Sequence, residues 1–134
     1  MGVWGTGIFD SDEASDFASE VAEGGGIEAV EEALDRVLNS ADDYLELPDA
    51  AAGLVAAEVV ARLRGRPGPA SAYADTLDAW IAEESPVVPA ALAKKAKSAI
   101  ALILADSSEM AEQWHETDDF DEWKRTVDGL AARL

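Results

Sequence analysis

The sequence predicts an all-α protein that folds as a single compact helical domain over residues 1–134, with about six or seven helices. Apolar residues make up 49% of the 134 positions, which is enough to bury one core. They recur every three or four residues almost throughout the chain, the period of an amphipathic helix. No segment shows the sustained alternation of apolar and polar residues that marks a half-buried strand.

The first half of the chain predicts three helices. Apolar residues at helical spacing predict a first helix over residues 14–21, which the glycine run of residues 23–27 ends. A second amphipathic helix is expected over residues 27–38. A third, over residues 49–64, is apolar nearly all round, which indicates a central position, and Pro48 suits its first turn.

The second half predicts the remaining helices. A short helix is expected over residues 72–83, and residues 89–105 predict a second apolar helix that joins the third at the centre of the domain. Asp106 offers an N-cap with Glu109 three positions later, so another short helix should follow. From Phe120, apolar side chains at 3-4-3-4 spacing predict a closing helix.

Charge is the strongest signal in the composition, since 28 acidic residues face 10 basic ones and the formal net charge is −18. Residues 1–50 hold 14 acids and one base, residues 51–105 five and six, and residues 106–134 nine and three. A nearly neutral middle indicates that the middle supplies the core and the acidic ends surround it. Such charge repels phosphates and anionic lipids, so we expect neither nucleic acid nor membrane as a partner, and a basic protein is favoured.

Two further absences bear on the compartment. The chain has no cysteine, which excludes disulfides and thiolate metal sites and fits a reducing environment. The first twenty residues contain acids but no Lys or Arg, and no apolar run approaches the length of a membrane helix. We therefore expect a cytoplasmic protein.

The opening stretch "GVWGTG" resembles a phosphate-binding loop, because glycine lets backbone N–H groups approach an anion. The following carboxylates would repel a phosphate, so a nucleotide site is the less favoured reading. We expect instead that Trp4, Ile8 and Phe9 are apolar plugs, and that Asp10 caps the first helix with support from Glu13.

Glu58 is the most informative single residue of the sequence, because it is the one charged residue in an apolar stretch from Ala50 to Ala61. A buried carboxylate is costly unless it is paired. We favour a buried bridge to a Lys, an Arg or a Trp N–H. The alternative is a general base or metal ligand that pairs with Glu109.

Clustered carboxylates near the start raise the question of a cation site. Asp10, Asp12 and Asp16 do not open an EF-hand loop, because Ser15 and Val21 stand where that loop needs Gly and Glu. Loose binding of a hard cation stays open.

Aromatic residues are predicted mainly as core anchors. Periodicity favours burial of Trp80 and Trp123, while Trp4 or Trp114 could instead line a groove. His115 has no cysteine or second histidine to complete a zinc site, so it is predicted to be a surface or cap residue.

A small basic patch is predicted at the end of the third helix, where cations suit the helix dipole. It comprises Arg62, Arg64 and Arg66, which could also fold back on the acidic N-terminal segment.

The chain resembles a bacterial family known as domain of unknown function 4259. "MGVWGTGIFDSDEASDF" is similar to the family's Gly-x-Trp-Gly-x-Gly-x-Phe-Asp-x-Asp opening, and "YLELPDAAAGLVAAEVVARLRGRP", "SSEMAEQW" and "DEWKRTVDGLAARL" resemble later segments. The resemblance implies no substrate, cofactor or reaction. It implies these positions of the family pattern, which could converge on one pocket: Gly5, Gly7, Phe9, Asp10, Asp12, Glu58, Glu109, Trp114 and Trp123.

The favoured function is a non-catalytic interaction module that binds a basic protein, in the manner of an inhibitor or immunity protein, with no cofactor and no catalytic residue. The alternative is a small metal-dependent enzyme whose carboxylate site comprises Asp10, Asp12, Glu58 and Glu109.

Overall fold

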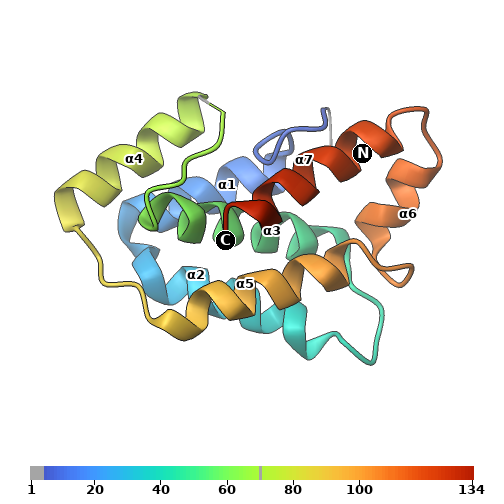
Figure 1. The fold of residues 1–134 in the computed structure, drawn as a ribbon, viewed down its shortest axis with the longest axis horizontal. Helices are drawn as coiled ribbons and strands as arrows, with labels where there is room; N and C mark the ends of the chain where they lie inside the picture. The colour runs from blue at the N-terminus through green and yellow to red at the C-terminus, as the bar shows by residue number, and fades with distance from the viewer. Residues whose placement is uncertain (1–4, 70) are drawn as a thin grey trace.

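The structure is a computed structural model that describes residues 5–69 and 71–134. Within these residues it contains α-helices joined by short loops and one π-helical turn, so the prediction of an all-α domain is confirmed (Figure 1). The elements are α1 (Asp12–Glu20), the π turn η1 (Val21–Gly25), α2 (Gly26–Asn39), α3 (Leu47–Leu63), α4 (Ala72–Glu84), α5 (Ala90–Ile103), α6 (Glu109–His115) and α7 (Phe120–Ala132).

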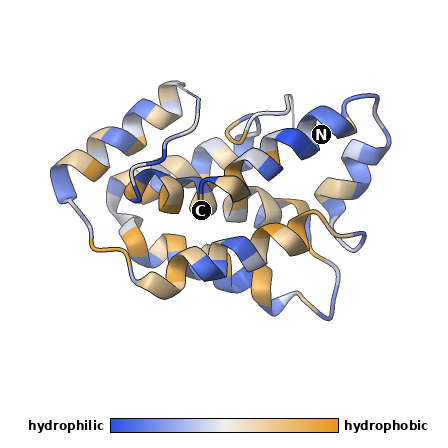
Figure 2. Ribbon diagram, in the orientation of Figure 1, coloured by the Kyte–Doolittle hydropathy of each residue, from blue (hydrophilic) through white to orange (hydrophobic). Residues whose placement is uncertain are grey.

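Helix α3 is the centre of the domain, as predicted. All its residues from Ala50 to Arg62 are buried, and α1, α2, α5 and α7 pack around it (Figure 1). Figure 2 shows the apolar colouring concentrated on α3 and on the sides of the helices that face it. Its many small residues allow close approach, since a Cβ added to Gly53 would lie 2.6 Å from Cγ2 of Val37 on α2.

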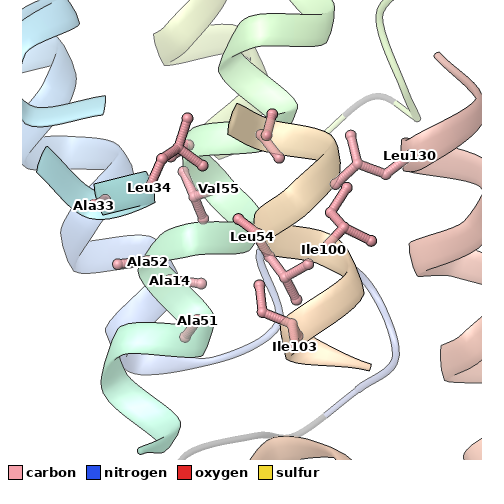
Figure 3. Close-up of a cluster of buried hydrophobic side chains, with 14 of the residues drawn as sticks. Ala14, Ala33, Leu34, Ala51, Ala52, Leu54, Val55, Ile100, Ile103 and Leu130 are labelled. Atoms are coloured by element: carbon pink, nitrogen blue, oxygen red, sulfur yellow. The ribbon is translucent and has the colours of Figure 1, made fainter. Parts of the chain in front are cut away.

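The core forms where five helices meet. Figure 3 shows side chains from α1, α2, α3, α5 and α7 in one cluster, with Leu34, Val55 and Ile103 completely or almost completely removed from solvent. Truncation of a buried Leu or Ile to Ala in such a core costs about 2–5 kcal/mol. This shared core fixes the relative positions of the helices that carry the candidate site.

Helix α5 is the second apolar helix that the sequence predicted. It packs along α2 and α3, but one face is open to solvent and carries Lys94 and Lys97. Lys95 lies at the edge and donates to Glu31 of α2 at 3.0 Å and to Asp35 at 2.9 Å. These hydrogen bonds, first that to Asp35 and then that to Glu31, raise the pKa of Lys95.

Two predicted caps are wrong by one or two residues. The N-cap of α1 is Ser11, whose Oγ accepts from Ala14 N at 3.0 Å, so Asp10 is left for another role. The N-cap of α6 is Ser108, not Asp106, and its Oγ accepts from Ala111 N. In both places the short hydroxyl side chain reaches the third amide of the helix.

The glycine run breaks the helix as predicted. Gly24 has φ 143° and Gly26 has φ 60°, conformations in which a side chain would be strained, and they turn the chain from α1 into α2. Helix α4 lies at the edge of the domain, and its Trp80 is half-buried rather than fully buried. No helix in the described part of the chain is long and apolar enough to cross a membrane.

Candidate functional site

The glycine-rich opening is folded around its own carboxylate. Asp10 Oδ2 accepts from the backbone N–H of Gly7 at 2.9 Å. A Cβ added to Gly5 or to Gly7 would lie 2.6 or 2.7 Å from the same oxygen. The Asp10 side chain therefore packs directly against the backbone of both glycines, and a side chain at either position would have to displace its carboxylate.

The loop packs onto two tryptophans. Gly5, Gly7 and Asp10 line a gap of about 10 Å³, whose opposite side is formed by Trp114 and Trp123. A gap of this size holds at most about one water molecule. The glycine-rich opening and the segment "SSEMAEQW", which contains Trp114, therefore lie against each other as a packing contact.

The aromatic side chains on the far side of this gap are stacked. Trp114 and Trp123 lie with ring centroids 6.2 Å apart at 14°, and Trp123 is 2% exposed, so its predicted burial is confirmed. His115 is exposed at the end of α6, as predicted, and stacks on Phe120 at 3.7 Å. Trp4, predicted to be a plug, lies outside the described residues.

Glu109 acts at the start of the central helix. Its Oε1 accepts from Leu47 N at 2.7 Å, and its own backbone N–H donates to Leu45 O at 2.9 Å. It thereby satisfies a backbone donor in the first turn of α3, where negative charge also complements the helix dipole. Asp12 is exposed in the first turn of α1 and belongs to neither the gap nor the central helix.

Glu58 lies near the other end of α3 and is 1% exposed. Arg133 donates to it through both terminal nitrogens, at 2.7 Å to Oε1 and 2.9 Å to Oε2, in a bidentate pair. Gly68 N donates to Oε2 at 3.2 Å. Arg62 Nε lies 3.0 Å from the same oxygen as an ion pair, although its N–H makes no hydrogen bond. The favoured reading, a buried carboxylate paired with arginine, is thus what the structure has.

The predicted basic patch is wrong for one of its members. Arg62 is 7% exposed, and besides Glu58 it contacts Asp78 of α4, to which Nη1 donates at 2.9 and 2.8 Å. Its Nη2 donates to the carbonyl oxygens of Gly68 and Pro69. Arg62 therefore ties the loop after α3 and the helix α4 to the core, because a buried guanidinium needs several acceptors.

An open pocket of about 450 Å³ lies above this ion network, between the N-terminal loop, the loop before α4 and helix α7. Glu58 and Arg133 contribute to its lining, and Asp10 and Arg125 are its other charged residues. Ile8, Phe9 and Pro69 supply apolar surface. The centroid of the Phe9 ring lies 6.3 Å from that of the Tyr73 ring. The volume lies in the range of small-molecule sites.

The family-pattern residues thus do not share one site. Asp10 and Phe9 line the open pocket with Glu58, whereas Glu109 lies at the start of α3, about 16 Å along the helix from Glu58. Within residues 5–69 and 71–134, no three Asp, Glu or His side chains are grouped so as to hold a metal ion. The carboxylate set of the metal-enzyme alternative is therefore not assembled in this fold.

Several residues of the site gave little signal in the sequence. Arg62 stands four positions after Glu58, a spacing that pairs charges on a helix and could have been recognised. Arg133 is 75 positions away, so no local pattern links it to Glu58. Arg125 and Gly129 are brought to the pocket only by the packing of α7.

The fold and these contacts define a small acidic helical domain with a buried ion network beside an open pocket. A family model described as "Domain of unknown function (DUF4259)" matches residues 2–126, and the chain belongs to this family. Neither a curated protein nor a solved structure matches the chain.

Proposed function

We propose that this chain is a non-catalytic interaction module that binds a basic protein, in the manner of an inhibitor or immunity protein. It would act in the reducing cytoplasm of a bacterial cell, which the lack of cysteine allows. The observation that carries the proposal is the number of exposed carboxylates on α1, η1 and α2. These residues are Asp12, Asp16, Glu20, Glu23, Glu28, Glu31 and Glu32.

The distribution of basic residues supports the same conclusion. Arg62 and Arg133, two of the ten basic side chains, pair with the buried Glu58. Near the acidic helices, Lys95 bridges Glu31 and Asp35, and Arg36 pairs with Asp49 at 3.8 Å. Most of the carboxylates on α1 and α2 thus make no ion pair with the described residues. A surface of such carboxylates steers a cationic protein toward it.

The buried carboxylate supports binding rather than catalysis. Glu58 already receives two hydrogen bonds from Arg133 and one from Gly68 N, besides the ion pair with Arg62. A general base must offer a lone pair to the proton that it takes. Oε2 accepts two of these hydrogen bonds and Oε1 accepts one, so most of the acceptor capacity of Glu58 is used within the protein.

The test compares two charge variants of equal size. One replaces Glu20, Glu28 and Glu32 by Gln on α1 and α2. The control replaces Asp118 and Asp121 by Asn and Glu122 by Gln around the start of α7, where these residues are also exposed. Proteins captured from lysate at low and high salt are identified, and their affinity for each purified variant is then measured by calorimetry.

We expect one basic partner whose affinity falls by about tenfold in the first variant and little in the control, and whose binding weakens with salt. A partner that binds both variants equally, or that ignores salt, would contradict the proposal.

A further inference from the structure

The charged residues that line the open pocket suggest a second binding site, separate from the acidic surface of α1 and α2. It is lined by two charged side chains of opposite sign that do not pair with each other, Asp10 and Arg125. Among the described residues neither of them makes an ion pair. The other two charged residues of the lining, Glu58 and Arg133, are fully engaged with each other.

The pocket offers both a negatively charged hydrogen-bond acceptor and a positively charged donor to a ligand. Asp10 uses Oδ2 for the Gly7 amide, and no hydrogen bond from the described residues reaches its Oδ1. Arg125 offers the donor fork of a guanidinium, which matches a carboxylate. Ser71 Oγ accepts from Ala74 N, so its O–H can still donate into the pocket. A ligand that uses all of these needs one anionic and one cationic group.

The apolar lining of the pocket favours a ligand that also has an apolar part. Ile8, Phe9 and Pro69 line the pocket on the side of the N-terminal loop and the loop before α4. On the side of α7 stands Gly129. Apart from its two chain neighbours and the backbone of its own helix, no atom of the described chain lies within 4 Å of the position that its Cβ would take. Glycine inside a helix costs about 1 kcal/mol relative to alanine, and packing within the chain does not require it here. Its missing side chain widens the pocket.

The pocket is preformed by its surroundings. The Glu58–Arg133 pair forms the floor, and Arg133 also donates to Arg66 O at 3.1 Å, which fixes the loop after α3. A Cβ on Gly68 would lie 2.7 Å from Nη2 of Arg133, so the loop closes tightly over the guanidinium. A rigid site loses little free energy in ordering itself around a ligand.

We propose that this pocket binds a small zwitterion with an apolar side chain, of the class of the apolar α-amino acids. The carboxylate pairs with Arg125, the ammonium group with Asp10, and the side chain lies against Phe9 and the space beside Gly129. A ligand of zero net charge also fits a chain of net charge −18, since the overall field neither attracts nor repels it.

The experiment titrates the purified chain with L-phenylalanine and with two analogues that each lack one charge, 3-phenylpropionate and phenethylamine. Binding is followed by calorimetry and by chemical shifts of backbone amides. We expect saturable binding of phenylalanine, about tenfold or more tighter than that of either analogue, with the largest shifts at Ser71, Thr126 and Gly129.

Two variants and one control complete the test. Arg125→Gln removes the guanidinium and Gly129→Leu fills the pocket, and each should weaken phenylalanine binding by about tenfold or more. Arg64→Gln makes the same change of charge at an exposed arginine outside the pocket lining and should leave binding unchanged. Absence of saturable binding, equal binding of a single-charge analogue, or an unaffected Arg125→Gln variant would each overturn the proposal.

Discussion

The two ends of the central helix α3 are each held by a carboxylate, but in opposite ways. At the first turn, Glu109 reaches across from α6 and accepts from Leu47 N at 2.7 Å. Near the last turn, Glu58 belongs to α3 itself and receives the guanidinium groups of Arg62 and Arg133. Anion at the N-terminus and cations at the C-terminus both suit the helix dipole, so both ends are electrostatically satisfied.

The surroundings of the two ends differ more than their charges. Toward the first turn, the N-terminal loop packs on Trp114 and Trp123 and leaves a gap of about 10 Å³. Toward the last turn, the same loop leaves an open pocket of about 450 Å³. The motif residues mostly make the closed end. Gly129 and Arg133 of α7 help to line the open end. The closed gap and the open pocket thus lie toward opposite ends of one helix.

The largest effect is expected at the open end, from Glu58→Ala. This variant leaves two arginines without their buried partner, so the free energy of unfolding should fall by about 3–5 kcal/mol in chemical denaturation. Asp78→Asn is the control, because it removes the other partner of Arg62 at a half-exposed side chain and should cost less than about 1 kcal/mol. A loss below about 1 kcal/mol for Glu58→Ala would show that the network does not hold this end together.

At the glycine loop, Gly7→Ala should lower the free energy of unfolding by about 1–3 kcal/mol. The new Cβ would lie 2.7 Å from Asp10 Oδ2 and force this carboxylate away from the Gly7 amide. In an Asp10→Ala background the same change should cost much less, because nothing is displaced. Equal costs in the two backgrounds would mean that Asp10 is not the reason for the glycine.

At the closed end, Glu109→Ala should lower the free energy of unfolding by about 1 kcal/mol, since the Leu47 amide loses its acceptor. Glu109→Gln keeps an acceptor oxygen and should recover most of the loss. The neighbouring Glu112 is exposed, and its change to Ala is expected to stay within about 0.5 kcal/mol. A Gln variant as unstable as the Ala variant would assign the effect to charge instead of the cap.

These contrasts also explain what the sequence could predict. The all-α fold, the central helix and a paired Glu58 follow from periodicity and from the cost of burying charge, which are local properties of residues 50–61. The apolar character of α5 and its lysines could be read from the sequence, but which of these lysines face solvent depends on how the helix packs. Half-burial of Trp80 was missed because the edge position of α4 depends on tertiary packing.

The candidate site was less predictable than the fold. That Asp10 would hold a glycine loop and leave capping to Ser11 depends on geometry within five residues, where two cap residues of similar preference stand side by side. The partner of Glu58 could be expected to be an arginine, but Arg133 lies 75 residues away and is identified by packing alone. The pocket has no motif, because its charged residues come from three separate segments.

The smallest effect should have opposite signs at two glycines of similar helical setting. Gly129→Ala should raise the free energy of unfolding by about 0.5–1 kcal/mol, because the helix gains propensity and the new Cβ meets no described atom within 4 Å apart from its chain neighbours and its own helix backbone. Gly53→Ala should lower it, because its Cβ would lie 2.6 Å from Val37 Cγ2 and the packing of α2 on α3 outweighs propensity. If Gly129→Ala were destabilising in thermal and chemical denaturation, the space beside α7 would be filled by the chain itself. The open end would then be as closed as the other.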